Sequence, residues 1–361
     1  MPTVFFAFRD APERRAALRS PGALDRYRLF GLDDMRARGA DVRHNLERGR
    51  APLWARAVAN VANRALHLTG GYGGDFGSVL GSLRVLNRAD VVFATADTVG
   101  LPLVLLKRAG VVRPPVVYTT IGLPERLLQV RRRRLYADAL GSASTIVTYS
   151  QAEADWLGVW IGQRAPEIVF VPFGVDVDAF SPHPDGSIDV VSVGADPQRD
   201  LMLLREVAVR RPELRFGVVT TKVLSRALEP LPVNVVMETD VPLERVRELL
   251  ADARVVALPV RRNSYSGATT VLLQAMALAK PVVVSRTDAI ASGYALEDGV
   301  NCRLVEPGDA DAFEHALVET LADAKGLGER ARATVERDYS WQRYIDALWD
   351  ILSAAWVREA S

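Results

Sequence analysis

The stretch that decides the fold is L-P-V-R-R-N-S-Y-S-G-A-T-T-V-L-L-Q-A-M-A-L-A-K-P-V-V-V-S, residues 258–285. A strand is expected to end at Pro259, a polar loop containing Gly267 follows, and the apolar pattern after Ala268 predicts a helix. From Pro281 a β-branched run predicts the next strand. A loop that leads from a parallel strand into a helix N-terminus presents free N–H groups and partial positive charge. Such a segment is suited to bind phosphate.

The spacing of three polar residues in this stretch supports a ligand on one helix face. Ser266, Thr270 and Gln274 are four residues apart, whereas most positions between them are apolar. Polar side chains on a buried helix need partners, and a bound nucleotide would supply them. The alternative is that Ser266 only caps a buried helix whose Gln274 is satisfied within the protein.

Outward from this stretch, short β-branched runs alternate with amphipathic segments, which predicts parallel sheets flanked by helices. In the first half, strands are expected at Val4–Phe8, Asp90–Thr95, Val116–Thr120, Thr145–Tyr149 and Val169–Val171, and helices at Leu24–Arg38, Leu101–Ala109 and Arg126–Leu140. In the second half, strands are expected at Asp189–Val193, Arg215–Val219, Val233–Met237, Arg254–Leu258 and Pro281–Ser285, and helices at Asp200–Arg210, Leu243–Asp252, Thr269–Ala279 and Ala310–Leu321.

The length of 361 residues exceeds what one hydrophobic core usually supports and indicates two domains. We expect an α/β fold with two Rossmann-like, doubly wound domains facing a central cleft. The N-terminal domain comprises residues 1–175, the C-terminal domain residues 176–338, and a last helix, residues 339–361, packs back toward the N-terminal domain. Ligands of such sheets bind beyond the carboxyl ends of the strands, so the cleft is the expected site.

Charge also distinguishes the two halves. Residues 1–175 contain 24 Lys+Arg and 15 Asp+Glu, a net charge of +9, whereas the remainder contains 21 and 29, a net charge of −8. Either the first half contacts something anionic, or each domain has its own surface charge. The run Arg131–Arg134 also has two interpretations. It either contacts an anionic membrane or forms a solvated helix face. Nucleic acid is not expected, because interleaved aromatic residues are missing from the basic half.

The composition is that of an ordinary globular protein, with 49% hydrophobic and 25% charged residues. Apolar runs such as Leu101–Leu106 are far too short to span a membrane. The opening M-P-T-V-F-F-A-F-R-D has no basic segment before its apolar residues, which favours a first strand over a signal peptide. The single cysteine, Cys302, suits a reducing compartment, so a cytoplasmic location is expected, with association at the cytoplasmic face of a membrane as a variant.

Three motifs resemble those of the retaining glycosyltransferases of family four. A-M-A-L-A-K-P-V-V-V (275–284) is similar to the family's Glu-Ala-Met-Ala, Gly-Lys-Pro-Val-Val segment, and D-G-V-N-C-R-L-V-E-P-G-D (298–309) to its Asp-Gly-x-Asn-Gly-x-Leu-Val-x-Pro-Gly-Asp segment. V-P-F-G-V-D-V-D-A-F-S-P (171–182) is similar to its connector between domains. The motifs follow the family's order, and the resemblance covers roughly residues 145–350. It implies the GT-B fold and a site for a nucleoside-diphosphate sugar.

The two motif glutamates of the family are absent, because Ser266 and Gln274 stand at their positions. By resemblance, Ser266 contacts the donor sugar, whereas Gln274, together with Val241, contacts the nucleoside. Ser266 and Arg199 are the candidates for the catalytic role, which is stabilisation of the donor and the leaving group without a protein nucleophile.

The family's diphosphate clamp is also altered. V-G-A-D-P-Q-R-D (193–200) keeps Gly194 and places Arg199 near the clamp lysine, while the clamp arginine is replaced by Ala195. A guanidinium group can hold two phosphate oxygens at once. Arg261 and Arg262 either replace the missing arginine or form a solvated pair. The predicted diphosphate ligands are Arg199, Arg262, Gly267, Ala268, Thr269 and Thr270.

The resemblance implies transfer of a hexose from a nucleoside-diphosphate sugar to a hydroxyl of a small-molecule or lipid acceptor, with retention. The leaving diphosphate accepts the acceptor's proton, so catalysis rests on positioning and electrostatics. The sequence has no Asp-x-Asp motif or His cluster that would require a metal, so neither metal nor cofactor is expected. The alternatives are a catalytically impaired nucleotide-binding or partner subunit of the same fold, and an epimerase, for which the needed carboxylates cannot be assigned.

The acceptor side is predicted less sharply. Arg9, Thr120 and Gly122 should lie at the cleft ends of first-domain strands. The family often has a histidine near the position of Thr120, which T-T-I-G-L-P-E-R does not supply. Ser150 and Glu153 are typical of a capping box that opens the helix after Tyr149.

Overall fold

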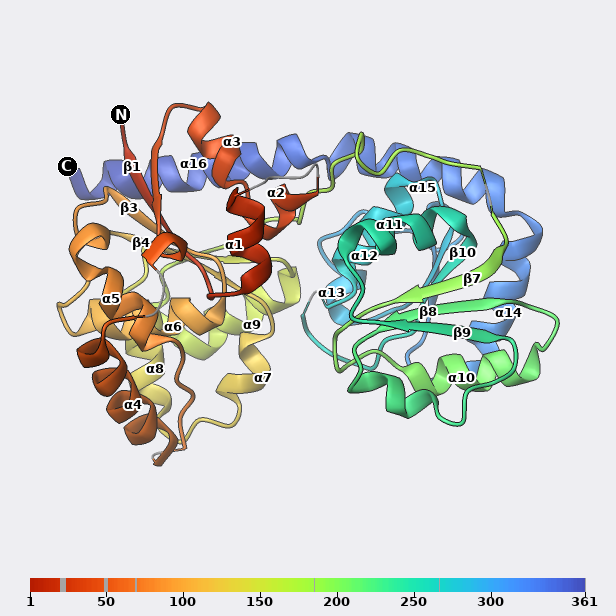
Figure 1. Cartoon of the computed structure of the whole chain (residues 1–361), viewed down its shortest axis with the longest axis horizontal. Coiled ribbons are helices and arrows are strands. Elements are labelled where there is room, and N and C mark those ends of the chain that lie inside the picture. Colours follow the sequence, from red (N-terminus) through yellow and green to blue (C-terminus); the bar gives the residue numbers. More distant parts are fainter. Residues whose placement is uncertain (20–23, 49–50, 69, 185, 266, 361) are drawn as a thin grey trace. The chain divides into compact units, whose positions relative to one another are not determined.

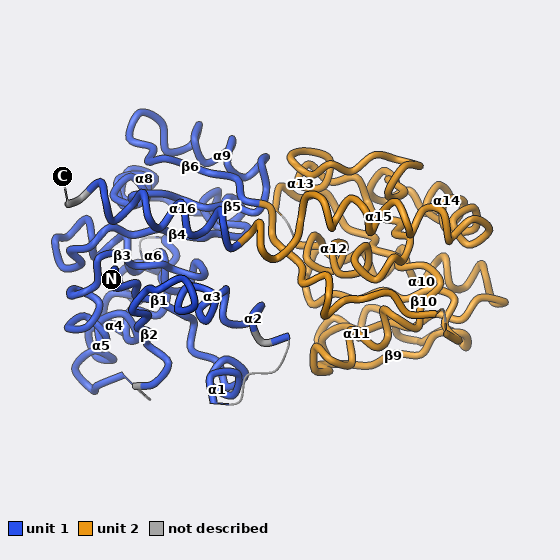
Figure 2. Tube along the Cα trace, turned by 90° about the horizontal axis from the view of Figure 1, so that it is seen from above, with its two compact units in different colours: residues 1–171, 345–361 blue, residues 172–344 orange. Residues whose placement is uncertain are grey.

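The computed structural model describes residues 1–19, 24–48, 51–68, 70–184, 186–265 and 267–360. The chain forms two compact units, coloured separately in Figure 2. The first unit contains Met1–Val171 and Ile345–Ser361, and the second contains Pro172–Tyr344. Each unit has a parallel six-stranded sheet flanked by helices, which confirms the predicted α/β class.

The sheet of the first unit has the order β2-β1-β3-β4-β5-β6 (Figure 1). The strands are β1 (Thr3–Ala7), β2 (Asp41–His44), β3 (Val91–Ala94), β4 (Val116–Thr120), β5 (Thr145–Thr148) and β6 (Glu167–Phe170). Strands β3, β4 and β5 are buried at every position, as expected for parallel strands covered on both faces. The order reverses at β1, so the loops after β1 and β3 flank the switch point where doubly wound sheets bind ligands.

The helices of the first unit are α1 (Pro12–Arg19), α2 (Asp25–Arg28), α3 (Leu32–Ala37), η1 (Leu46–Arg48), α4 (Leu53–Leu68), α5 (Phe76–Leu86), α6 (Asp97–Arg108), α7 (Leu123–Leu127), α8 (Arg133–Leu140), α9 (Gln151–Ile161) and η2 (Gly162–Arg164). The main core packs α6 and α8 against the sheet through residues such as Leu103, Tyr118 and Leu140. Helix α4 lies outside this core and packs on α5 (Figure 1).

Two helices that were predicted as continuous are interrupted. The predicted helix Leu24–Arg38 is wrong, because Phe30 and Gly31 have φ values of 51° and 76° and separate α2 from α3. The predicted helix Arg126–Leu140 is also wrong: α7 ends at Leu127, and α8 begins only at Arg133.

The second unit has the strand order β12-β11-β10-β7-β8-β9. Its strands are β7 (Ile188–Val193), β8 (Phe216–Thr220), β9 (Val235–Thr239), β10 (Ala253–Leu258), β11 (Val282–Ser285) and β12 (Arg303–Val305). In this Rossmann-type order the direction reverses between β7 and β10. The loops after β7 and β10 therefore lie at the second unit's switch point.

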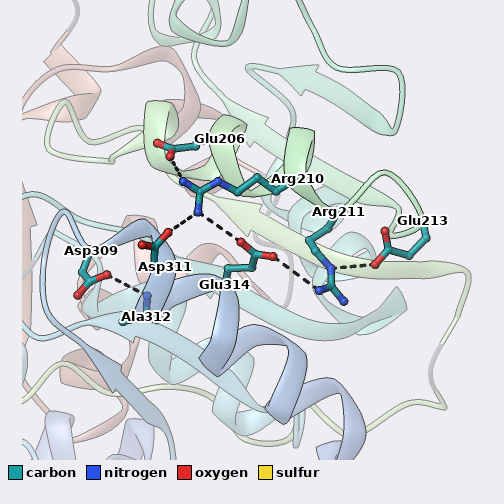
Figure 3. A network of polar contacts seen from close by, with 8 residues as sticks. All are labelled: Glu206, Arg210, Arg211, Glu213, Asp309, Asp311, Ala312 and Glu314. Atoms are coloured by element: carbon teal, nitrogen blue, oxygen red, sulfur yellow. Dashed lines mark hydrogen bonds and ion pairs between the residues drawn. The ribbon is translucent and has the colours of Figure 1, made fainter.

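The helices of the second unit are α10 (Leu201–Arg210), η3 (Leu224–Leu228), α11 (Leu243–Asp252), α12 (Thr269–Ala277), α13 (Asp288–Ala291), α14 (Ala310–Ala322) and α15 (Ala324–Asp338). Figure 3 shows an ion-pair network in which Arg210 of α10 contacts Asp311 and Glu314 of α14. These pairs are solvent-exposed and contribute little to stability. The apolar core beneath them, which includes Val207 and Phe313, holds the helices to the sheet.

The last helix, α16 (Trp341–Ala360), belongs to both units. In the second unit, Trp341 and Tyr344 pack against Phe173. From residue 345 onward the helix is part of the first unit. There Asp346 of α16 forms an ion pair with Arg38, the C-cap residue of α3. Within the described ranges, no helix is long and apolar enough to cross a bilayer.

Candidate functional site

Two loops meet at the switch point of the second unit. The loop after β7 leads into α10, and the loop after β10 leads into α12. The amide of Asp200 donates to the Pro259 carbonyl at 2.9 Å, and the amide of Arg261 donates to the Gln198 carbonyl at 2.8 Å. The segment around Arg199 and the one around Val260 thus form a short antiparallel bridge. The two motifs that the sequence singled out are held side by side.

Arg199 is a buried cation with open hydrogen-bonding capacity. Arg199 is 4% exposed, and its Nε and Nη1 atoms have no hydrogen-bond partner among the described residues. Burial lowers the pKa of Arg199 to about 10, an effect that the nearby Asp196 and Tyr265 partly oppose. The guanidinium is therefore charged at neutral pH. A buried charge without full partners costs free energy unless a ligand completes it.

Gly194 makes room for this guanidinium. A Cβ atom at Gly194 would lie 2.0 Å from Nε of Arg199, so any larger residue there would force the guanidinium to move. The carbonyl of Gly194 also accepts a hydrogen bond from Thr220 at 2.8 Å, which fixes the end of β7. The glycine of the V-G-A-D-P-Q-R-D motif is thus required by close packing against Arg199.

The start of α12 is open. Its N-cap residue, Ala268, makes no side-chain cap, and the amide groups of the first turn have no protein partner among the described residues. Thr269 is buried, whereas Thr270 is exposed on the first turn. Ser266, predicted to contact the donor sugar, lies outside the described residues. Unpaired amides and the helix dipole favour an anion at this position.

Asp196 is the residue at this site that sequence reasoning missed. The Tyr265 hydroxyl donates to Asp196 Oδ1 at 2.7 Å, and the Gln198 amide donates to the same oxygen at 2.7 Å. A Cβ atom at Gly267 would lie 2.9 Å from the other carboxylate oxygen. In the unliganded protein, Asp196 thus ties the two loops together and partly neutralises Arg199. Its position after a motif glycine is the only sequence signal for this role.

The predicted nucleoside ligands differ in their surroundings. Gln274 is buried in α12, with 3% of its surface exposed. Val241 is half-buried in the loop between β9 and α11. Arg262 is exposed and forms a 3.1 Å ion pair with Glu306 after β12. Arg199, Gly194 and the start of α12 are therefore brought together, whereas Arg262 is engaged elsewhere.

The corresponding edge of the first unit is organised around buried acids. Asp97, at the start of α6, accepts a hydrogen bond from the Tyr118 hydroxyl at 2.8 Å and lies 3.7 Å from Arg126. Burial raises the pKa of Asp97, with Arg126 among the groups that oppose the shift. Thr120, a predicted acceptor-side residue, is fully buried at the end of β4 and donates to Glu153 at 3.4 Å.

Glu153 has a different role from the one predicted. Ser150 does accept the Glu153 amide at 3.3 Å, which is half of a capping box. The Glu153 carboxyl does not return to Ser150; its Oε1 accepts the Leu123 amide at 3.1 Å, while no described residue donates to Oε2. Burial, helped by the neighbouring Asp97, raises the pKa of Glu153 to about 8. The side chain is thus held as a neutral acid.

The other two acceptor-side candidates lie close to this edge. Arg9 follows β1 and is exposed, and its carbonyl accepts a hydrogen bond from Arg14 at 2.8 Å. Gly122 has a φ of 74° and stands at the N-cap of α7, a conformation that favours glycine. No group of three potential metal-ligating side chains occurs among the described residues.

Comparison with solved structures identifies the architecture. A sucrose-phosphate synthase from Thermosynechococcus elongatus aligns over 100% of both chains with a TM-score of 0.75 and 14% sequence identity. The Anabaena protein Alr3699/HepE, in complex with UDP-glucose, aligns over 98% of this chain and 100% of its own, with a TM-score of 0.72 and 17% identity. The protein has the GT-B fold.

A family model also matches part of the sequence of this GT-B protein. Residues 190–323 match the model for Glycosyl transferases group 1, and this segment contains both loops of the second-unit site. A glycosyltransferase from Rickettsia africae also aligns over 98% of both chains, with a TM-score of 0.65 and 13% identity. No curated protein matches the chain. The resemblance seen in the sequence is confirmed at the level of the GT-B fold, and residues 190–323 are similar to group 1; membership of family four stays a prediction.

Proposed function

We propose that this GT-B protein transfers a hexose from a nucleoside-diphosphate sugar to a hydroxyl of a small-molecule or lipid acceptor. The observation that carries the proposal is the buried, incompletely hydrogen-bonded Arg199 beside the open start of α12. A diphosphate would complete both, with its oxygens on the guanidinium and on the free amides. UDP-sugars are the first donors to test, because the similar HepE structure contains UDP-glucose.

The proposed reaction proceeds with retention and without a metal. The bond between the sugar's anomeric carbon and the diphosphate breaks, a bond from the acceptor oxygen forms on the same face, and the acceptor proton moves to the leaving diphosphate. Arg199 and the α12 amides stabilise the charge that develops on the leaving group. Ser266 is proposed to contact the donor sugar, and Gln274 and Val241 the nucleoside. On the acceptor side we propose Arg9, Thr120 and Gly122.

The test is a thermal-shift and turnover screen with nucleoside diphosphates and their sugars, with and without a chelator. We expect one nucleoside diphosphate to raise the melting temperature through preferential binding to the folded state. We also expect its sugar to be hydrolysed slowly, with water replacing the acceptor, and chelator to leave the rate unchanged. The configuration of the released sugar, followed by NMR, would match that of the donor if transfer retains configuration.

The second candidate function is a nucleotide-binding or partner subunit without turnover. It is favoured by Ser266 and Gln274, which stand where the related enzymes have glutamates. Binding of a nucleotide without release of sugar from any donor would support this role. Absence of any nucleotide response would contradict sugar transfer and favour the role of a partner subunit.

A further inference from the structure

Helix α4 of the first unit is packed with its small side chains inward. Ala55 and Ala59 are its buried residues, and they form a small cluster with Phe76 and Leu80 of α5. Gly81 on α5 favours this close approach, because a Cβ atom there would lie 3.1 Å from Pro52, just before α4. The inner face of α4 is thus built mainly from alanines, together with the half-buried Leu66.

Most of the large apolar side chains of α4 are exposed to solvent instead. We call the α4 stripe the exposed residues Trp54, Ala57, Val58, Val61, Ala65 and Leu68. Trp54, Val58, Val61, Ala65 and Leu68 are spaced by four, three, four and three residues, which places them on one helix face. Trp54 is 56%, Val61 70% and Leu68 77% exposed. A helix that only had to pack on its own domain would have the opposite arrangement.

The surroundings of the α4 stripe are basic. Residues 53–68 contain no Asp or Glu, and Arg56, Arg64 and His67 are exposed beside the stripe. The exposed run Arg131–Arg134 adjoins the C-terminal end of α4. The Arg131 amide donates to the Gly70 carbonyl at 3.3 Å, and a Cβ atom at Gly70 would lie 2.8 Å from the Arg131 side chain.

From this combination we propose that α4 docks the protein on an anionic lipid bilayer. The α4 stripe would enter the boundary between headgroups and acyl chains, and the arginines would contact lipid phosphates. The helix is about 24 Å long at 1.5 Å per residue, long enough to lie in the plane of the interface. A protein partner would not require this one-sided positive charge. The proposal does not depend on sugar transfer, because lipid binding is measured without nucleotide.

The experiment is co-sedimentation of the full chain with vesicles of phosphatidylcholine alone or phosphatidylcholine with phosphatidylglycerol. We expect binding to the anionic vesicles only, weakening with added salt. Val61→Asp should lower the affinity roughly tenfold or more, because it places a charge in the stripe. Val233→Asp is the matched control, since Val233 is fully exposed in the second unit and far from α4 in sequence. It should bind as the unmodified protein does.

Insertion of α4 into the bilayer is measured in a separate experiment, through the fluorescence of Trp54. Brominated lipids should quench its fluorescence, and Trp54→Phe should remove most of that quenching although five other tryptophans remain. Circular dichroism melting confirms that each variant is folded. Absence of binding to anionic vesicles, or equal binding by Val61→Asp and Val233→Asp, would overturn the proposal. The proposal would also be overturned if the protein formed a dimer and Val61→Asp abolished the dimer but not the lipid binding.

Discussion

The two sheets present opposite chemistry at equivalent edges. Beyond β7 and β10, the second unit buries a cation, Arg199, with two nitrogen atoms unpartnered. Beyond β3 and β4, the first unit buries two acids: Asp97 accepts from the Tyr118 hydroxyl, whereas Glu153 accepts from the Thr120 hydroxyl and the Leu123 amide. A buried acid lowers its cost by keeping a proton, whereas an arginine cannot lose its charge at neutral pH. The second edge is therefore suited to an anionic ligand, whereas the acids of the first edge reduce their cost by staying protonated.

The sharpest way to break this comparison is Arg199→Met, which keeps much of the side-chain volume but removes the charge. We expect affinity for the nucleoside diphosphate to fall by about 1.5–3 kcal/mol, the value of a charged hydrogen bond. The unliganded protein should become more stable, because an incompletely paired buried charge has been removed. Calorimetric titration and thermal melting measure the two effects.

Arg262→Ala is the matched control for that change. Arg262 is exposed and paired with Glu306, so its loss should alter nucleotide affinity by less than about 0.5 kcal/mol. If both variants bind alike, the buried cation is not a diphosphate ligand. If Arg262→Ala binds the nucleotide more weakly than Arg199→Met does, Arg262 takes the role of the missing clamp arginine.

Glu153→Gln tests the other side of the comparison. An unfolded glutamate ionises near 4.5, whereas burial raises the pKa of Glu153 to about 8 in the folded protein. Between these values the folded state binds more protons, so the free energy of unfolding should fall as pH rises. Glutamine cannot ionise, so its advantage over glutamate should grow by about 1 kcal/mol or more from pH 5 to pH 8.

Urea unfolding followed by tryptophan fluorescence measures this difference. Five of the six tryptophans lie in the first unit, so the signal reports mainly on the unit that contains Glu153. Glu13→Gln, an exposed change in the same unit, should show no such pH dependence. Parallel stability curves for Glu153→Gln and Glu13→Gln would mean that Glu153 is ionised in the fold.

The smallest effect is expected for Asp196→Asn. Asparagine can still accept the hydrogen bonds from Tyr265 and Gln198, but it no longer repels a diphosphate at the start of α12. We expect nucleotide affinity to rise by about 0.5–1 kcal/mol, less at high salt. Titration at two salt concentrations checks this. Weaker binding by Asp196→Asn would show that the carboxylate supports the ligand.

Periodic segments with clear stop signals were predictable from the sequence. Helix α11 has the predicted bounds, and β4 matches residue for residue, because each periodic run begins directly after a proline, Pro242 and Pro115. The division of Leu24–Arg38 was not predictable, since Phe30 takes a positive φ that its residue type disfavours. Strands β2 and β12 are short and carry charged residues, so no apolar run marked them.

At the site, motif spacing predicted that Gly194, Arg199 and the start of α12 would converge. It did not predict Asp196 or the carboxyl pair Asp97 and Glu153. Their roles depend on what burial does to a charge, and burial is a property of the packed chain. The apparent capping box at Glu153 shows the same limit: its local pattern is real, but a partner from α7 takes the carboxyl group.

The division of α16 between the units affects the order of events during synthesis. Residues 345–360 complete the first unit, yet they are made after the whole second unit. At roughly 5–20 residues per second, the ribosome needs about 10–35 s to synthesise the second unit. During that interval the first unit lacks the residues of its last helix, and the second unit can fold first. The first unit, although its synthesis begins first, is therefore the later of the two to be completed.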